Sequence, residues 1–219
     1  MFLLFCLCWW TLTAESGSKT NEIQSVSVME EDSVTLHTFV TKIHEDDDIQ
    51  WIFGAKIIAK ISIEKQNLST FYSLDERFRD RLKLDDQTGS LTIMNISTLH
   101  AGVYQLKINA AKLSSKTFSV SVYSPLPTPD LTRDCASSSS SCSLLCSAVN
   151  VGHVTLSWYK GNSLLSSISV SDLSISLSLP LEVEYQDKNT YSCVINNPIR
   201  NQTKHLNISQ LCQPCSGQS

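Results

Sequence analysis

Two cysteines in the second half of the chain, Cys146 and Cys193, constrain its fold more than any other feature. They are 47 residues apart (193 − 146), and Trp158 follows the first of them by 12 (158 − 146). Tyr191 lies two residues before the second cysteine. Apolar and polar residues alternate around all four positions, which is the pattern of half-buried β-strands. We therefore expect the two cysteines to join the two sheets of a β-sandwich.

This spacing is typical of an immunoglobulin sandwich. There, a disulfide joins strand B to strand F, a tryptophan on strand C packs against it, and a tyrosine corner precedes the second cysteine. Another secreted β fold with two structural cysteines is the alternative, but four agreeing features favour the immunoglobulin fold. Only 35 residues separate Trp158 from Cys193 (193 − 158), too few for a C″ strand. The sequence therefore predicts a constant-like domain, with strand E at 173–179 and strand G around Leu206 and Ile208.

Another sandwich is expected in the N-terminal half, before the domain that contains Cys146 and Cys193, because 219 residues suffice for two domains. The string from His100 to Leu106 resembles the Asp-x-Gly-x-Tyr-x-Cys pattern of immunoglobulin variable domains, with histidine for the aspartate and leucine for the cysteine. Thr38 occupies the partner cysteine position, and the distance of 68 residues (106 − 38) leaves room for C′ and C″ strands. We expect a variable-like domain without its disulfide, held by a core of Leu36, Trp51, Leu91, Ile93, Tyr104, Leu106, Phe118, Val120 and Val122.

The domain boundaries follow from composition. The apolar run in residues 1–16 reads as a signal peptide, although it lacks a basic residue at its start. The variable-like domain is assigned to 22–123, a proline-spaced linker to 124–131, the constant-like domain to 132–212 and a tail to 213–219. No second apolar run of about 18 residues exists. The protein is expected to be secreted as written, or to be an ectodomain whose membrane segment is missing from this version.

Metal, cofactor and nucleic-acid roles find little support. The net charge of −4 offers no attraction for nucleic acid. The acidic run 44–48 lacks the glycine-punctuated loop of a calcium site and reads as a solvated loop. His100 is interpreted as a solvated loop residue, with a pH switch as the alternative. The run of charges in 75–81 reads as an exposed turn, and the five serines 137–141 as a loop. We expect no metal, no cofactor and no small-molecule substrate.

Four sequons predict N-glycosylation in a secreted chain, at Asn67, Asn95, Asn201 and Asn207.

A cysteine-less variable-like domain followed by a constant-like domain with extra cysteines resembles the signalling lymphocytic activation molecule family and related lymphocyte adhesion receptors. The resemblance covers residues from about 22 to 215. It implies a glycosylated leukocyte-surface protein that adheres to a like or related molecule on a facing cell. Contact would use the G-F-C-C′-C″ face of the first domain. On that face, strand alternation turns outward Gln50, Ile52, Lys60, Gln105 and Lys107.

Four further cysteines lie outside the core pair: Cys135, Cys142, Cys212 and Cys215. We expect Cys142–Cys212 and Cys135–Cys215 bridges, although four cysteines allow three connectivities. A redox or zinc role for the C-x-x-C string 212–215 would need a reducing compartment or a second ligand pair.

Three functions compete: a cell-surface binding module, a secreted decoy of the same receptor–ligand pair, and an enzyme. No nucleophile triad or carboxylate pair supports the enzyme. The first two differ only in attachment, so a downstream exon encoding an apolar span would favour the receptor.

Overall fold

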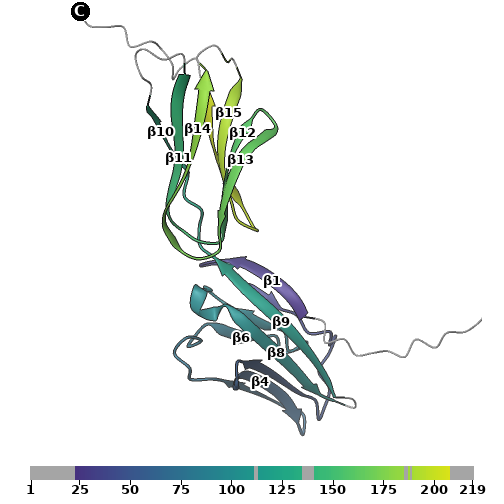
Figure 1. Cartoon of the computed structure of the whole chain (residues 1–219). Coiled ribbons are helices and arrows are strands. Elements are labelled where there is room, and N and C mark those ends of the chain that lie inside the picture. The colour runs from purple at the N-terminus through teal and green to yellow at the C-terminus, as the bar shows by residue number, and fades with distance from the viewer. Residues whose placement is uncertain (1–22, 111–112, 135–140, 185–186, 188, 208–219) are drawn as a thin grey trace, which may run out of the picture.

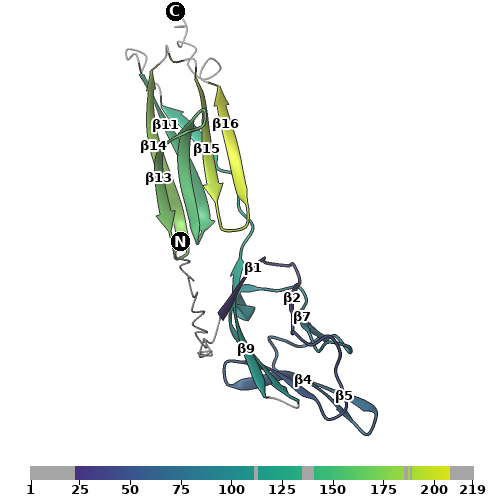
Figure 2. The ribbon, with the colours of Figure 1, turned by 90° about the vertical axis from the view of Figure 1, so that its right-hand side faces the viewer.

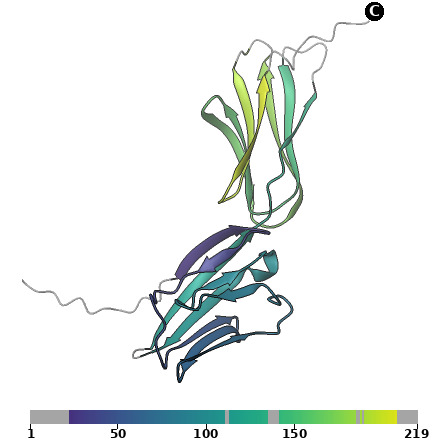
Figure 3. The ribbon, with the colours of Figure 1, turned by 180° about the vertical axis from the view of Figure 1, so that it is seen from behind.

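The computed structural model describes residues 23–110, 113–134, 141–184, 187 and 189–207, which form two successive β-sandwiches (Figure 1). The sandwiches lie end to end, joined by the segment that follows β9 (Figures 1 and 3). The expected signal peptide and the expected tail lie outside the described residues.

The first sandwich has a large and a small sheet. Its strands are β1 (Ile23–Met29), β2 (Val34–Leu36), β3 (Asp48–Phe53), β4 (Lys56–Glu64), β5 (Asn67–Tyr72), β6 (Leu82–Leu84), β7 (Leu91–Ile93), β8 (Gly102–Asn109) and β9 (Ser114–Tyr123), with a 3-10 turn η1 (Thr98–His100) before β8. A six-stranded sheet in the order β1-β9-β8-β3-β4-β5 packs against a three-stranded sheet in the order β2-β7-β6. Strand β1 runs parallel to β9, and the remaining pairs are antiparallel. Because β4 and β5 supply the C′ and C″ strands, the variable-like prediction is confirmed.

Every residue of the expected first-domain core is buried. Trp51 lies at its centre, with its ring centroid 5.5 Å from that of Phe118. The period-2 alternation of the strands therefore predicted the interior correctly.

Hydrogen bonds occupy the region where the disulfide is missing. The hydroxyl of Thr38 donates to the carbonyl of Thr88 (2.6 Å) and accepts the Val40 amide (3.3 Å). The indole of Trp51 donates to the carbonyl of Gly89 (2.8 Å). Each such bond contributes about 1 kcal/mol net, so the three together are comparable with the roughly 2–4 kcal/mol of a disulfide.

His100 is buried rather than solvated, so the interpretation of this residue as a loop position in water is wrong. It is 1% exposed, and its ring packs at a tilt against that of Phe78, which is also buried, with the centroids 5.2 Å apart. The Ser97 amide donates to Nδ1 (2.9 Å), and Nε2 lies 2.6 Å from the carbonyl of Arg77. A neutral imidazole protonated on Nε2 satisfies both contacts, which is why histidine can replace the aspartate here.

The charged run 75–81 is accordingly only partly exposed. Phe78 enters the core, while the Arg77 guanidinium bonds to Asp75 at 2.8 and 3.0 Å. That hydrogen-bonded ion pair holds the pKa of Asp75 well below its usual range. Arg81 donates to the carbonyl of Asn95.

The second sandwich comprises β10 (Asp130–Asp134), β11 (Ser141–Val151), β12 (Val154–Lys160), β13 (Ser163–Val170), β14 (Ser174–Glu184), β15 (Thr190–Asn196) and β16 (Asn201–Asn207). Its sheets have the orders β10-β11-β14 and β13-β12-β15-β16. The neighbouring strands β15 and β16 can be followed side by side in Figure 2. Strand β13 pairs with β12, so it extends the C-F-G sheet, whereas the fourth strand of a constant domain joins the A-B-E sheet. Strand β10 begins inside the expected linker, and Ser141 begins β11 rather than ending a loop.

The expected core bridge, Cys146–Cys193, is present, with a Cα–Cα distance of 6.3 Å. Trp158 is fully buried and lies opposite Cys193 in register. The Tyr191 hydroxyl donates to the carboxylate of Asp187 (2.7 Å). Tyr104 makes the corresponding bond to a backbone carbonyl, that of His100 (2.7 Å).

The outer bridges remain a prediction. Cys142 is buried and disulfide-bonded, whereas Cys135, Cys212 and Cys215 lie outside the described residues, as does Ile208.

Strand β14 differs from the expected strand E. It starts at Ser174 and continues to Glu184, and it buries Leu177 and Val183. Ile175 has the same alternation phase as Leu177 but is 82% exposed.

Candidate recognition face

The outer surface of the six-stranded sheet brings the five predicted contact residues together. On β8, burial alternates so that Gln105 and Lys107 point outward while Leu106 points into the core. In register, Lys107 lies opposite Gln50 on β3, and Gln50 lies opposite Lys60 on β4. Gln105 lies opposite Ile52 in the adjacent row. We call the outward side chains of β8, β3, β4 and β5 the recognition face; its role in binding is a proposal made below.

An ion pair that the sequence did not indicate organises the centre of this face. Asp48 begins β3 and accepts hydrogen bonds on Oδ2 from Lys60 Nζ (2.9 Å) and Gln50 Nε2 (3.1 Å). The interpretation of 44–48 as one solvated loop is therefore wrong at its last residue, which is half-buried in the sheet. The pair holds Lys60 against the sheet, whereas Lys107 is exposed and makes no ion pair within the described ranges.

Apolar side chains flank the polar row, and they were missed as contact candidates. Ile57 on β4, Phe71 on β5 and Val103 on β8 are all exposed. Phe71 continues the central row, because it lies opposite Lys60, and Ile57 lies opposite Ile52. The consecutive apolar residues 57–59 were a signal, but a run without alternation does not tell which of its side chains face outward.

Three of the four predicted glycan acceptors have described side chains, and all three are exposed: Asn67, Asn95 and Asn201. Asn67 follows the tight turn at Lys65 and Gln66, both with positive φ, that joins β4 to β5. A glycan there would border the recognition face. Asn207 ends β16, and its side chain is outside the description. Occupancy at all four remains a prediction.

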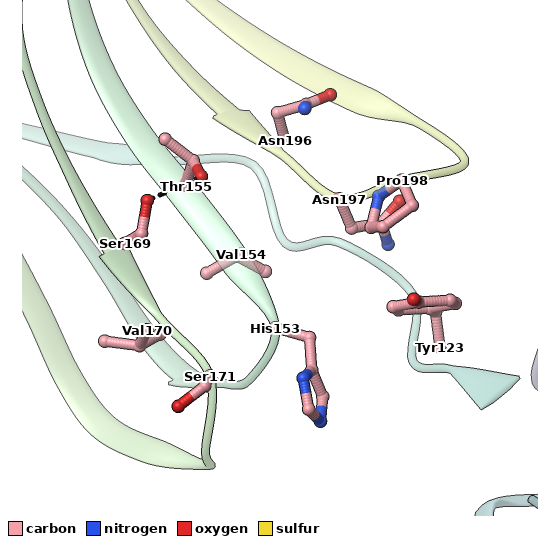
Figure 4. A pocket seen from close by; sticks show the side chains of 10 residues that line it. All are labelled: Tyr123, His153, Val154, Thr155, Ser169, Val170, Ser171, Asn196, Asn197 and Pro198. Atoms are coloured by element: carbon pink, nitrogen blue, oxygen red, sulfur yellow. Dashed lines mark hydrogen bonds between the residues drawn. The ribbon is translucent and has the colours of Figure 1, made fainter. Parts of the chain in front are cut away.

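A cleft of about 550 Å³ lies where the two sandwiches meet (Figure 4). Tyr123 from the end of β9 approaches His153 from the second domain with ring centroids 6.2 Å apart. Thr155 and Ser169 also line the cleft, with their hydroxyls hydrogen-bonded at 2.8 Å. Its lining contains neither carboxylate nor ammonium groups. The cleft thus offers hydrogen-bonding groups and one imidazole, that of His153, at the junction between the domains.

Strongly perturbed acids serve structural bonds elsewhere. Lys160 and Tyr191 both donate to Asp187 and hold its pKa well below the usual range. Burial raises the pKa of Tyr104. Among the residues that the structure describes, no group of three or more His, Cys, Asp or Glu side chains is arranged to hold a metal ion. The described part of the chain contains no helix that is long and apolar enough to cross a membrane.

Comparison with known proteins identifies the fold. No family model matches the sequence. The solved structure of murine CEACAM1b is similar over 83% of this chain and 94% of its own, with 18% identity and a TM-score of 0.57. The extracellular portion of mouse CD200RLa is similar over 85% and 99%, with 15% identity and a TM-score of 0.53. The full ectodomain of mouse nectin-like molecule 4, described as Ig1–Ig3, is similar over 84% of this chain and 65% of its own, with 11% identity and a TM-score of 0.56.

Proposed function

We propose that this protein is an extracellular recognition and adhesion protein of leukocytes. It binds a like or related immunoglobulin-family receptor through the recognition face of its first domain. The observation that carries the proposal is the composition of that face. An Asp48–Lys60 pair and exposed Lys107 lie within one sheet surface that also exposes Ile57, Phe71 and Val103.

The mixed character of the face suits selective and reversible protein binding. Exposed apolar side chains grouped on one surface supply desolvation energy, while charged groups set the choice of partner and the encounter rate. The sheet beneath packs on the core through the buried Trp51 and Leu106. The leukocyte setting rests on the resemblance to the signalling lymphocytic activation molecule family.

Extracellular placement is supported by the core disulfide, since such bonds persist in oxidising compartments. Two of the similar structures are themselves described as an extracellular portion and an ectodomain. A binding module is favoured over an enzyme because the groups with shifted pKa values are engaged in structural contacts: Asp75 with Arg77, Tyr104 with the carbonyl of His100, and Asp187 with Lys160 and Tyr191.

The test is charge reversal with a matched control on the opposite sheet. Lys107→Glu should slow association with the partner by about tenfold at low ionic strength, because an exposed, unpaired charge acts mainly on the encounter rate. Lys83→Glu makes the same change on β6 of the small sheet, where the side chain is exposed, and should leave binding unchanged. Surface plasmon resonance against immobilised copies of this protein and a panel of immunoglobulin-family receptors gives both rates.

Melting temperatures of both variants should match that of the parent protein. If Lys60→Glu and Lys107→Glu together leave every interaction intact while Lys83→Glu abolishes one, the wrong face has been chosen.

A further inference from the structure

The edges of the second sandwich are protected unequally. A strand at a sheet edge exposes backbone groups that can pair with another chain, and natural proteins block such edges with charges or proline. Three of the four edge strands follow this rule: β10 carries Asp130, Arg133 and Asp134; β14 carries Pro180, Glu182 and Glu184; β16 carries Lys204 and the sequon at Asn201.

Strand β13 has neither charges nor proline, although a register shift in its pairing with β12 leaves Leu165 as a bulged residue, so its regular part is Ser166–Val170. Its eight residues, Ser163–Val170, include no charged residue, no proline and no sequon. It pairs with β12 on one side, and no strand of the described residues pairs with its other side. Three of its aliphatic side chains are exposed: Leu164 by 56%, Leu165 by 44% and Ile168 by 39%.

The surroundings of β13 are also uncharged and partly apolar. Leu173 and Ile175, at the start of β14, are largely exposed, and β13 and β14 contact each other across the two sheets. From Ser163 to Leu181 the sequence contains a single charged residue, Asp172. Charge therefore does not oppose the approach of an identical surface.

We propose that β13 is a docking edge for β13 of a second copy of this chain, paired antiparallel about a twofold axis. An antiparallel strand pair is self-complementary, because each strand supplies both donors and acceptors. A twofold contact of one surface with itself closes at two copies. The two four-stranded sheets then join into one continuous sheet, and the exposed leucines and isoleucine become cross-strand neighbours of their counterparts.

This contact is separate from the recognition face, because the two surfaces belong to different domains. A dimer formed through β13 leaves both recognition faces available, so each could contribute to binding at the same time. A single added strand buries little area, which places the contact in the weak, concentration-dependent class.

The experiment measures self-association of the full chain by sedimentation velocity over a wide concentration range. Hydrogen exchange of the backbone amides is followed at the lowest and highest concentrations. A monomer–dimer equilibrium is expected, with concentration-dependent protection confined to residues 163–170. The double variant Leu165→Lys and Ile168→Lys should weaken the dimer by roughly tenfold or more, because it places like charges opposite each other.

Val149→Lys is the matched control, since Val149 is an exposed aliphatic residue on β11 of the other sheet. The Val149→Lys variant should dimerise as the parent protein does. Lys60→Glu with Lys107→Glu should also leave the dimer unchanged. If the double variant on β13 does not fold, Ser167→Lys places one charge on the same strand.

Four results would overturn the proposal. They are a chain that stays monomeric at the highest concentration, assemblies larger than a dimer that persist when Lys60 and Lys107 are both reversed to glutamate, protection that appears only on the first domain, and loss of the dimer in the Val149→Lys control. If β13 paired with a strand of a different protein and the chain did not self-associate, the proposal that a second copy binds at β13 would also be rejected.

Discussion

Replacing Gly89 by alanine should destabilise the first domain by about 2–5 kcal/mol. Gly89 has φ = +67°, and a Cβ added there would lie 2.6 Å from Cδ1 of Ile49 and 3.3 Å from its Cγ2. A left-handed conformation costs a residue with a side chain about 1–2 kcal/mol. Ile49 is fully buried, so pushing it aside overpacks the core at a further cost of about 1–3 kcal/mol.

Gly54 provides the matched control. It has φ = +59°, and an added Cβ meets nothing within 4 Å. Gly54→Ala therefore carries the backbone cost alone, about 1–2 kcal/mol. Both alanines also reduce the entropy of the unfolded chain similarly, so the difference between the two variants isolates the contact with Ile49.

Calorimetric unfolding of the full chain is the assay. The first-domain transition is the one that reductant leaves in place. One kcal/mol shifts the melting temperature of a domain this size by about 4–8 °C, so Gly89→Ala should melt on the order of 10 °C below Gly54→Ala. Equal melting temperatures would refute the reasoning, because they would show that Ile49 moves without cost.

Three further outcomes are expected. Reducing the disulfides should lower the stability of the second domain by about 2–5 kcal/mol. Calorimetry with and without reductant should show the first-domain transition at the same temperature. A comparable loss in the first domain would contradict the assignment of Thr38 and Leu106 to the two positions where a variable domain has its bridging cysteines. The pKa of Asp187 is lowered by Lys160, so the stability that this ion pair contributes is complete above the unfolded carboxyl pKa of about 3.9 and is lost as the pH falls below that value. Asp187→Asn should therefore make the stability of the second domain depend less steeply on pH in acid. An equally steep dependence would argue against a stabilising Asp187–Lys160 pair. Thr38→Val removes the hydroxyl bonded to Thr88 and Val40 and should cost about 1–3 kcal/mol in urea unfolding, whereas Thr38→Ser keeps the hydroxyl and should cost less.

Strand alternation predicted the two sandwiches and the core around Trp51 and Trp158, because burial on one face imposes a period of two on the sequence. Alternation failed to predict burial at positions where burial depends on which other segments pack over the residue. Ile175 has the phase of a core residue but is 82% exposed. Phe78 was not predicted as a core residue because it lies within a run of charged residues. His100 is buried because its ring packs on Phe78 and its Nε2 is hydrogen-bonded to the carbonyl of Arg77. Contacts between segments so far apart in the chain leave no local periodic signal.

The recognition face was likewise predicted only in part. Alternation gave the outward direction of Gln105 and Lys107 on β8, but the register between β3 and β4 that joins Asp48 to Lys60 depends on a β-bulge after Trp51. A bulge shifts pairing by one residue, and the apolar run that contains Ile57 gave no indication of it.

Strand β9 has a mechanical consequence for the molecule. It pairs with β8 on one side and with the parallel β1 on the other, and its last residue, Tyr123, leads directly into the connection to the second domain (Figure 1). A pulling force transmitted through the second domain would enter the first along this strand. The hydrogen bonds of both ladders lie across that direction, so the load is shared along their whole length in shear instead of opening one bond at a time. A partner held on the recognition face would therefore be anchored through a strand built to resist tension.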